Sequence, residues 1–325
     1  MRTAIFLGFT ITTFLSVTTQ PGYSAELKKA SLRPQWVPQA QFAGYYVAAA
    51  KGFYKDAGID LEIRPGGPGI VSINNVAAGK DTFGMDWLIS GIAAVSKGAP
   101  LVNISQMFQT SGLMLVAFKK SGIGEPKQMH EKQVGIWPGF FGMAPQLLFK
   151  KQAVQPRQVS QKFSVDDFLQ GKLDVASAMT YNEYPLILES GVKETDLKTF
   201  HYRDFGLNFP EDGIYVHSDT VKKDPELCKN FVKASIRGWL YAFAHENEAI
   251  DVVMKEAEKA KTGTTREHQQ TMLREVKKLT LYKIKDDQVG ELSKESFEFV
   301  QKSMKESNQI TKTVSFDGFY QPKYK

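Results

Sequence analysis

The stretch Trp36–Pro65 reads WVPQAQFAGYYVAAAKGFYKDAGIDLEIRP, and it decides the fold class. Before it, Ser31–Val37 has the character of a short strand that ends at a proline, which cannot donate a hydrogen bond to a sheet. The small apolar residues of Gln41–Lys51 then predict a buried helix, and the alternating apolar and charged residues of Ile59–Arg64 predict a second strand. Together they form a βαβ unit, in which the loop Pro38–Gln41 should face a ligand pocket at the carboxyl end of the first strand.

Predicted helices and strands continue to alternate after this unit, which is typical of an α/β fold with largely parallel sheets. The apolar run Leu113–Phe118 predicts a buried strand that crosses into a second lobe, and Ile214–Val216 predicts the strand that returns to the first lobe. We therefore predict two lobes, each a mixed, largely parallel sheet flanked by helices. Residues 26–115 and 214–325 form lobe 1, whose helical C-terminal part packs on its outer faces, and residues 116–213 form lobe 2.

The first 25 residues predict a signal peptide, because the apolar run Ala4–Val17 is too short to span a bilayer and a small-residue exit ends at Ala25. We therefore expect an exported, periplasmic protein, and we find no later apolar segment long enough to cross a membrane. The one cysteine, Cys228, cannot form an internal disulfide, so stability must come from a large core. We expect a monomer.

The formal net charge of +6 comes from basic residues scattered among nearly as many acids, which favours a solvated surface over a nucleic-acid partner. Metal, cofactor and catalytic roles lack support as well. The five histidines show no spacing typical of metal ligands, and no nucleophile elbow is present. The glycines of Pro65–Gly69 fit a tight turn better than a phosphate-binding loop.

Aromatic residues stand at or near the ends of predicted strands in both lobes: Trp36, Trp87, Trp137, Phe140, Phe141 and Tyr181. Each of them alone could be a core residue. A core does not need its rings at strand ends in both lobes, whereas a planar ligand held between the lobes does, because it stacks on aromatic rings. We therefore include all of them except Phe141 in the candidate site. Trp239, on a helix face with Phe231 and Phe243, is assigned to the core.

Polar side chains occur at the same strand ends and could bind the hydrogen-bonding edge of a heterocycle: Gln39, Gln41, Asp86, Asn182, Glu183, Glu211 and Asp212. All but Glu211 join the candidate site, together with Tyr45 and Gly67. Structural alternatives remain open for three of them. Asp212 precedes a glycine and could mark a turn, Asn182 could cap a helix, and Glu183 could act as an acid in the first turn of that helix.

Several motifs, in order along residues 31–245, resemble those of one protein family: the WVPQAQ opening, FGMDW at 83–87, GIWPGFFG at 135–142, MTYNEYP at 179–185 and PEDGIYV at 210–216. The chain resembles the periplasmic binding proteins of importers for taurine, sulfonates, nitrate and thiamine or riboflavin precursors, and most of all their thiamine-pyrimidine and riboflavin branch. The resemblance implies a type II periplasmic-binding-protein fold, a planar ligand between the lobes and a membrane permease as partner.

This sequence departs from that branch at one position of the opening motif. The branch carries a Trp-x-Pro-Asn-x-Asn-His opening, and its histidine position is Phe42 here. Related fungal pyrimidine synthases use that histidine in chemistry, beside a cysteine-rich motif that this sequence lacks. A binding protein for a thiamine-pyrimidine precursor or a riboflavin-like ring is therefore our main hypothesis. A thiamine-pyrimidine synthase and a ligand-sensing module of a signalling system are the alternatives.

Overall fold

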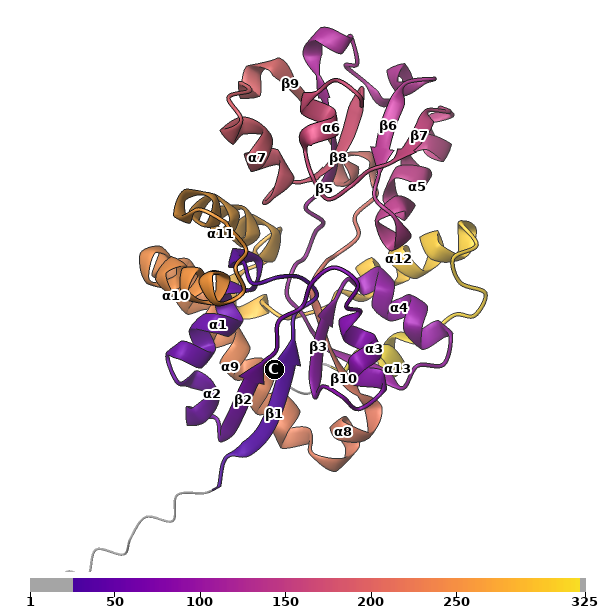
Figure 1. The fold of residues 1–325 in the computed structure, drawn as a ribbon. Coiled ribbons are helices and arrows are strands. Elements are labelled where there is room, and N and C mark those ends of the chain that lie inside the picture. Colours follow the sequence, from indigo (N-terminus) through magenta and orange to yellow (C-terminus); the bar gives the residue numbers. More distant parts are fainter. Residues whose placement is uncertain (1–25, 322–325) are drawn as a thin grey trace, which may run out of the picture.

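In the computed structural model, which describes residues 26–321, ten strands form two five-stranded sheets that lie one above the other in Figure 1. The predicted signal peptide lies outside the described residues. The first sheet has the order β2-β1-β3-β10-β4, with β1 Lys28–Arg33, β2 Ile59–Ile63, β3 Phe83–Asp86, β4 Leu101–Gln106 and β10 Gly213–His217. The second has the order β7-β6-β8-β5-β9, with β5 Leu113–Phe118, β6 Gln133–Ile136, β7 Arg157–Ser160, β8 Val175–Met179 and β9 Leu197–His201.

Each sheet contains one strand that runs against its neighbours, and this strand is the one that follows a crossover between the sheets. Strand β10 is antiparallel to β3 and β4, and β5 is antiparallel to β8 and β9. Gly213 at the start of β10 lies opposite Asp86 at the end of β3, and Leu113 at the start of β5 lies opposite Met179 at the end of β8. The strand ends beside both crossovers therefore lie at the edges where the two sheets face each other (Figure 1).

Most helices belong to the first sheet: α1 Ala43–Ala50, α2 Phe53–Asp56, α3 Ser72–Ala77, α4 Leu88–Ser96, α8 Ser218–Lys223, α9 Pro225–Ala244, α10 Glu246–Lys259, α11 Arg266–Thr280, α12 Lys294–Glu306 and α13 Phe316–Phe319. The second sheet carries α5 Met143–Gln152, α6 Asp166–Leu169 and α7 Glu183–Glu189. The short 3-10 helices are η1 Ala40–Phe42, η2 Lys119–Ser121, η3 Pro126–Met129, η4 Gly139–Gly142, η5 Glu194–Asp196, η6 Tyr202–Phe205 and η7 Asp286–Gln288.

Small residues let α1 and α9 pack closely in the core of the first lobe. A Cβ atom on Gly44 would lie 2.2 Å from Cγ of Trp239, and one on Gly238 would lie 2.1 Å from the carbonyl oxygen of Gly44. Only glycine fits such contacts, because ordinary carbon contacts need about 3.5–4.0 Å. Trp239 is fully buried, so its assignment to the core is confirmed.

Three sequence predictions differ from the structure. The first strand is Lys28–Arg33 rather than Ser31–Val37. The chain leaves the sheet directly after Arg33, whose guanidinium pairs with Asp81. The sequence also predicts a short strand at Phe163–Asp166, and this prediction is wrong, because these residues form a bend and the start of α6. The strand of the second sheet in this region is β7, a polar edge strand that pairs with β6. The lobe boundary at residue 115 falls inside β5, which pairs with β8 and β9 along its length, so the crossing into the second sheet precedes Leu113.

Candidate ligand-binding site

An unbroken series of aromatic rings crosses from the first sheet to the second at their facing edges. Trp36, in the loop after β1, meets Phe163 with ring centroids 5.0 Å apart, and Phe163 lies 5.5 Å from Trp137, which follows β6. Phe141, in η4, lies 5.7 Å from Trp137 and 4.8 Å from Trp87, which follows β3. Most of these pairs are edge to face, a favourable geometry for aromatic rings. We call these five rings the aromatic bridge.

Sequence reasoning found three members of the aromatic bridge and missed the roles of two. Phe163 follows β7, a polar strand that no apolar pattern indicates, so the strand-end signal could not identify it. Phe141 makes the ring contacts, whereas its predicted neighbour Phe140 is 36% exposed. Phe163 remains 44% exposed despite its contacts, so it lies at the mouth of the site. Trp137 is almost completely buried, and its indole N–H donates to the carbonyl of Lys162 at 3.2 Å.

A buried group of amides gathers around the carboxylate of Asp212, beside the first-sheet end of the bridge. The Nε2 atoms of Gln35 and Gln41 donate to Asp212 at 2.5 Å and 3.0 Å, and Nε2 of Gln39 donates to Oε1 of Gln41 at 2.6 Å. Asp212 has φ +56°, a strained conformation that Asp and Asn tolerate better than most residues. Burial, with the neighbouring charge of Glu211 as a further cause, raises the pKa of Asp212 well above its usual range.

Glu211 joins the two crossovers. Its Oε1 accepts hydrogen bonds from Oγ of Ser111 at 2.5 Å and from the backbone N–H of Gly112 at 2.8 Å, and its Oε2 accepts from the hydroxyl of Tyr181 at 3.4 Å. Burial raises the pKa of Glu211 to about 7, although these donors favour the charged form. Glu211 and Tyr181 therefore fix the region where the lobes meet.

Asp86 is the third carboxyl group at this edge. It ends β3 directly opposite Gly213, and its Oδ1 accepts from the backbone N–H of Trp87 at 2.8 Å. Burial raises the pKa of Asp86 to about 6. We call Asp86, Glu211 and Asp212, with the amides of Gln35, Gln39 and Gln41, the polar group. Asp86 precedes Trp87 and Gln35 precedes Trp36, so each first-sheet ring of the aromatic bridge is adjacent in sequence to a member of the polar group.

The Asn182–Glu183 pair occupies the equivalent edge of the second sheet. The carboxylate of Glu183 accepts from the backbone N–H of Met179 at 2.9 Å and from Nδ2 of Asn182 at 2.8 Å. Asn182 makes no side-chain hydrogen bond to the helix backbone, so the capping alternative does not describe its side chain. Burial raises the pKa of Glu183. These bonds fix the orientation of both side chains before any further partner binds.

Two other predicted residues lie at the margin of this arrangement. Tyr45 is fully buried on α1, with its ring 5.6 Å from that of Trp239, so it lies beneath the site rather than in the aromatic bridge. Gly67 is buried beside Val37, and a Cβ on the preceding Gly66 would lie 2.1 Å from the carbonyl oxygen of Pro34. The glycine-rich turn thus packs closely against the loop that carries Trp36.

The acids of the site differ from the buried Asp81 in their partners. Asp81 pairs with Arg33 at 2.5 Å and with Arg64 at 2.8 Å. Among the ion pairs of residues 26–321, none involves Asp86, Glu211 or Asp212, and the donors that reach them are amides, hydroxyls and backbone N–H groups.

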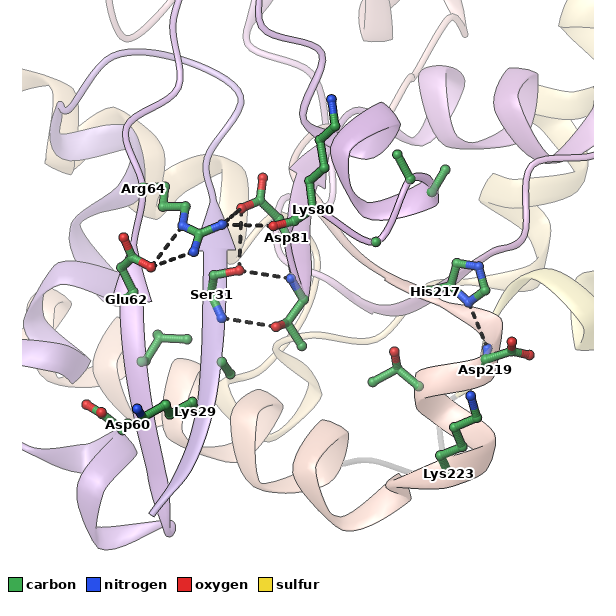
Figure 2. A pocket seen from close by; sticks show the side chains of 17 residues that line it. Lys29, Ser31, Asp60, Glu62, Arg64, Lys80, Asp81, His217, Asp219 and Lys223 are labelled. Atoms are coloured by element: carbon green, nitrogen blue, oxygen red, sulfur yellow. Dashed lines mark hydrogen bonds and ion pairs between the residues drawn. The ribbon is translucent and has the colours of Figure 1, made fainter. Parts of the chain in front are cut away.

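Two cavities of the structure lie elsewhere. One of about 940 Å³ opens at the opposite end of the first sheet, between the start of β1, the segment before β3 and α8 (Figure 2). Figure 2 shows Arg64 between Glu62 and Asp81 on one side of this hollow and His217 with Asp219 on the other. A second, of about 420 Å³, lies between the ends of α9 and α11. Neither reaches the aromatic bridge.

A family model described as NMT1/THI5 like matches residues 39–249, which is more than half of the chain and includes every ring of the aromatic bridge except Trp36. The chain belongs to this family. Our prediction of the family from its motifs is therefore confirmed.

Among curated relatives, the riboflavin-binding protein RibY of Chloroflexus aurantiacus is 25% identical over 264 residues, covering 75% of this chain and 70% of RibY. A formylaminopyrimidine-binding protein of Halalkalibacterium halodurans is 21% identical over 246 residues, covering 72% of each chain. The pyrimidine phosphate synthase THI11 of Saccharomyces cerevisiae is 22% identical over 223 residues, covering 64% of this chain and 65% of THI11. The curated relatives thus include both binding proteins and an enzyme.

Among solved structures, the periplasmic aliphatic sulphonate binding protein SsuA of Escherichia coli superposes with a TM-score of 0.70 at 14% identity, covering 91% of this chain and 92% of SsuA. This confirms the predicted two-lobe periplasmic-binding-protein fold. Within residues 26–321, no helix has the length and apolar character needed to cross a bilayer, and no group of three or more His, Cys, Asp or Glu side chains is arranged to hold a metal ion.

Proposed function

We propose that this protein is the exported substrate-binding component of an ABC importer and that it holds a planar heterocycle with N–H donors between its two lobes. The observation that carries this proposal is the aromatic bridge together with the polar group at its first-sheet end. Rings from both sheets already meet at favourable stacking distances. A flat ring system that enters between them would contact aromatic faces from both lobes, and each such contact contributes about 0.5–1.5 kcal/mol beyond area burial.

The polar group favours an uncharged or cationic ligand over an anion. Asp212, Glu211 and Asp86 are carboxyl groups in a buried region, and neutral donors rather than ion pairs hold them. An N–H group of a heterocycle can donate to such oxygens. A sulfonate placed here would face acceptor atoms and, once the acids ionise, like charges. The fold shared with SsuA therefore does not extend to a sulfonate ligand in this proposal.

A binding role fits the site better than the synthase alternative. Phe42, which stands at the histidine position of the related synthases, is a fully buried core residue of η1 and supplies no acid or base. The named functions of RibY and the formylaminopyrimidine-binding protein support ring binding without chemistry. We therefore propose that the protein is not an enzyme.

The proposed mechanism is a shift in population between an open and a closed form. The crossovers pair side by side, because the backbone N–H groups of Met107 and Phe108 donate to the carbonyls of Asp212 and Glu211 at 3.2 Å and 3.3 Å. A paired double crossover can bend while the two sheets remain rigid. A ligand captured by Trp36, Trp87 and the polar group of lobe 1 would favour closure by its contacts with lobe 2. A membrane permease would then recognise the closed form.

A ligand panel tests this proposal. Riboflavin, 4-amino-5-hydroxymethyl-2-methylpyrimidine and ethanesulfonate are titrated against the purified chain while tryptophan fluorescence and melting temperature are recorded. We expect at least one heterocycle to change the fluorescence and raise the melting temperature, because binding to the folded state alone stabilises it. Tight binding of ethanesulfonate without binding of either heterocycle would contradict the proposal.

Cell fractionation tests the export part separately. A mature form that starts near Glu26 should be recovered outside the cytoplasm. Recovery of the full-length chain in the cytoplasm would instead favour the synthase alternative.

A further inference from the structure

His268, on the first turns of α11, connects the two lobes beside the candidate site. Its side chain is almost completely buried and lies between two residues of the second lobe. Its Nδ1 lies 2.9 Å from Oε1 of Glu189, and its Nε2 lies 3.0 Å from Oδ1 of Asn182. Helix α11 belongs to the first lobe in Figure 1, whereas both partners belong to α7 or to the residue before it. The contact therefore joins the two lobes in the arrangement that the structure shows.

The neighbouring Gln269 binds the other half of the site. Its Oε1 accepts from the backbone N–H of Ala40 at 2.5 Å, and its Nε2 donates to Oγ1 of Thr264 at 2.8 Å. Ala40 stands between Gln39 and Gln41 in the loop that carries the polar group. Two consecutive residues of α11 thus hold the binding segment of lobe 1 and that of lobe 2 in one arrangement.

The hydrogen bonds around His268 determine its protonation in this arrangement. Nδ2 of Asn182 donates to Oε1 of Glu183, so the amide oxygen of Asn182 must face the imidazole. The other ring nitrogen faces a carboxylate oxygen. Both ring nitrogens therefore point at acceptors, and only the doubly protonated imidazolium can donate to both. A neutral ring would set one nitrogen lone pair against an oxygen.

We propose that protonated His268 is a positioning residue that favours closure and orients Asn182 and Glu183 for the ligand. We call the contact of His268 with Asn182 and Glu189 the closure contact. The distances given above support this contact directly, and only its effect on the ligand rests on the proposed function. Because the closed form uses both N–H donors of the ring and the open form does not require them, closure should be favoured at low pH and weakened at high pH.

Other titratable groups near His268 define the controls. The charged groups that face it or flank it are Glu183 and Glu189 on α7, Arg266 and Glu267 on α11 itself, and Asp251 on α10, which pairs with Arg266 at 2.6 Å. The 3-10 helix η1 carries no titratable group, and α9 meets α11 near Lys277, toward the far end of the helix. Burial also raises the pKa of Asp86 to about 6 and that of Glu211 to about 7, so the comparison must be made between the wild-type chain and a His268 variant.

Small-angle scattering of the chain without any added ligand, from pH 5 to pH 8.5, tests the closure contact. The radius of gyration of the wild type should rise with pH, and that of His268→Gln should change much less, because glutamine has no proton to release in this range. His130→Gln, at an exposed histidine, is the matched control and should behave as the wild type. An unchanging wild-type radius, or an equal change in His268→Gln, would overturn the proposal.

Affinity for whichever heterocycle of the panel binds gives the second measurement. At pH 5.5, His268→Gln should bind about tenfold or more weakly than the wild type, the effect of one lost charged hydrogen bond. At pH 8.5 the two should differ by about twofold at most. A difference that is the same at both pH values would mean that His268 acts only through packing. Failure of every heterocycle to bind would contradict the proposed function and leave the scattering result to decide on the closure contact.

Discussion

Asp81 and Asp212 are both buried carboxyl groups, but their partners predict opposite effects for the same substitution. Asp212→Asn should raise the free energy of unfolding at pH 7, because it removes a carboxyl group whose pKa burial has raised. It should also weaken ligand binding about tenfold or more, because one acceptor oxygen becomes an amide NH2 group that cannot accept a hydrogen bond from the ligand. Chemical denaturation and calorimetric titration measure the two quantities.

Asp81→Asn is the matched control. It should lower stability by about 2 kcal/mol, less than for a fully buried pair, because Arg33 and Arg64 are partly exposed. It should leave affinity unchanged, because the side-chain partners of Asp81 are Ser31, Arg33 and Arg64, none of which belongs to the candidate site. A loss of stability in Asp212→Asn together with unchanged affinity would assign Asp212 to the fold alone.

Glu211 should make stability depend on pH. Its pKa in the folded chain is about 7, above the value of about 4.3 for an exposed glutamate. The folded state therefore keeps a proton that the unfolded chain releases. This stability is fully present below about pH 4 and is lost as pH rises toward 7. Denaturation curves of Glu211→Gln should show a smaller decrease over that range than the wild type, and an identical decrease would contradict this account.

At the residue scale, the sequence indicated which residue types gather at the strand ends but not their partners. Trp36, Trp87 and Trp137 could be predicted because each lies at or just beyond the end of a predicted strand. Phe163 and His268 could not, because Phe163 follows the polar strand β7, which no apolar pattern indicates, and His268 lies on a helix distant in sequence. Their roles depend on contacts with the opposite lobe, which no local pattern reports.

At the element scale, the loop between β7 and α6 supplies the most exposed ring of the aromatic bridge. Phe163→Ala removes the ring contacts with Trp36 and Trp137. We expect affinity to fall about twofold to tenfold, since each aromatic pair contributes about 0.5–1.5 kcal/mol. Melting temperature without ligand should change little, because Phe163 is largely exposed.

Leu186→Ala is the control for this prediction. Leu186 is exposed to a similar degree on α7, but it has no place in the aromatic bridge. Fluorescence titration of both variants distinguishes the loss of a ring contact with the ligand from the loss of exposed apolar surface in general. Equal affinities for the two variants would remove Phe163 from the site.

The unbroken apolar run of β5 predicted this strand to the residue, Leu113–Phe118. The polar edge strand β7 has no such pattern, because one sheet neighbour is enough to form it and its side chains remain largely exposed. The end of β1 was also misplaced, because the Arg33–Asp81 pair and the departing loop, rather than strand propensity, determine where the strand stops.

At the scale of the whole molecule, the alternation of helices and strands was enough to predict two α/β lobes. It could not predict how far the lobes close on each other. That depends on contacts between residues far apart in sequence, such as Trp87 with Phe141 and His268 with Asn182. These contacts bring the binding segments of both lobes into one site.

A crystal structure with the heterocycle that binds most tightly in the ligand panel tests the central claim most directly. We predict that the ring lies between Trp36 and Trp87 on one side and Trp137, Phe141 and Phe163 on the other, with an N–H group within hydrogen-bonding distance of Asp212. A ligand bound instead in the hollow shown in Figure 2, with the aromatic bridge unchanged, would contradict the account.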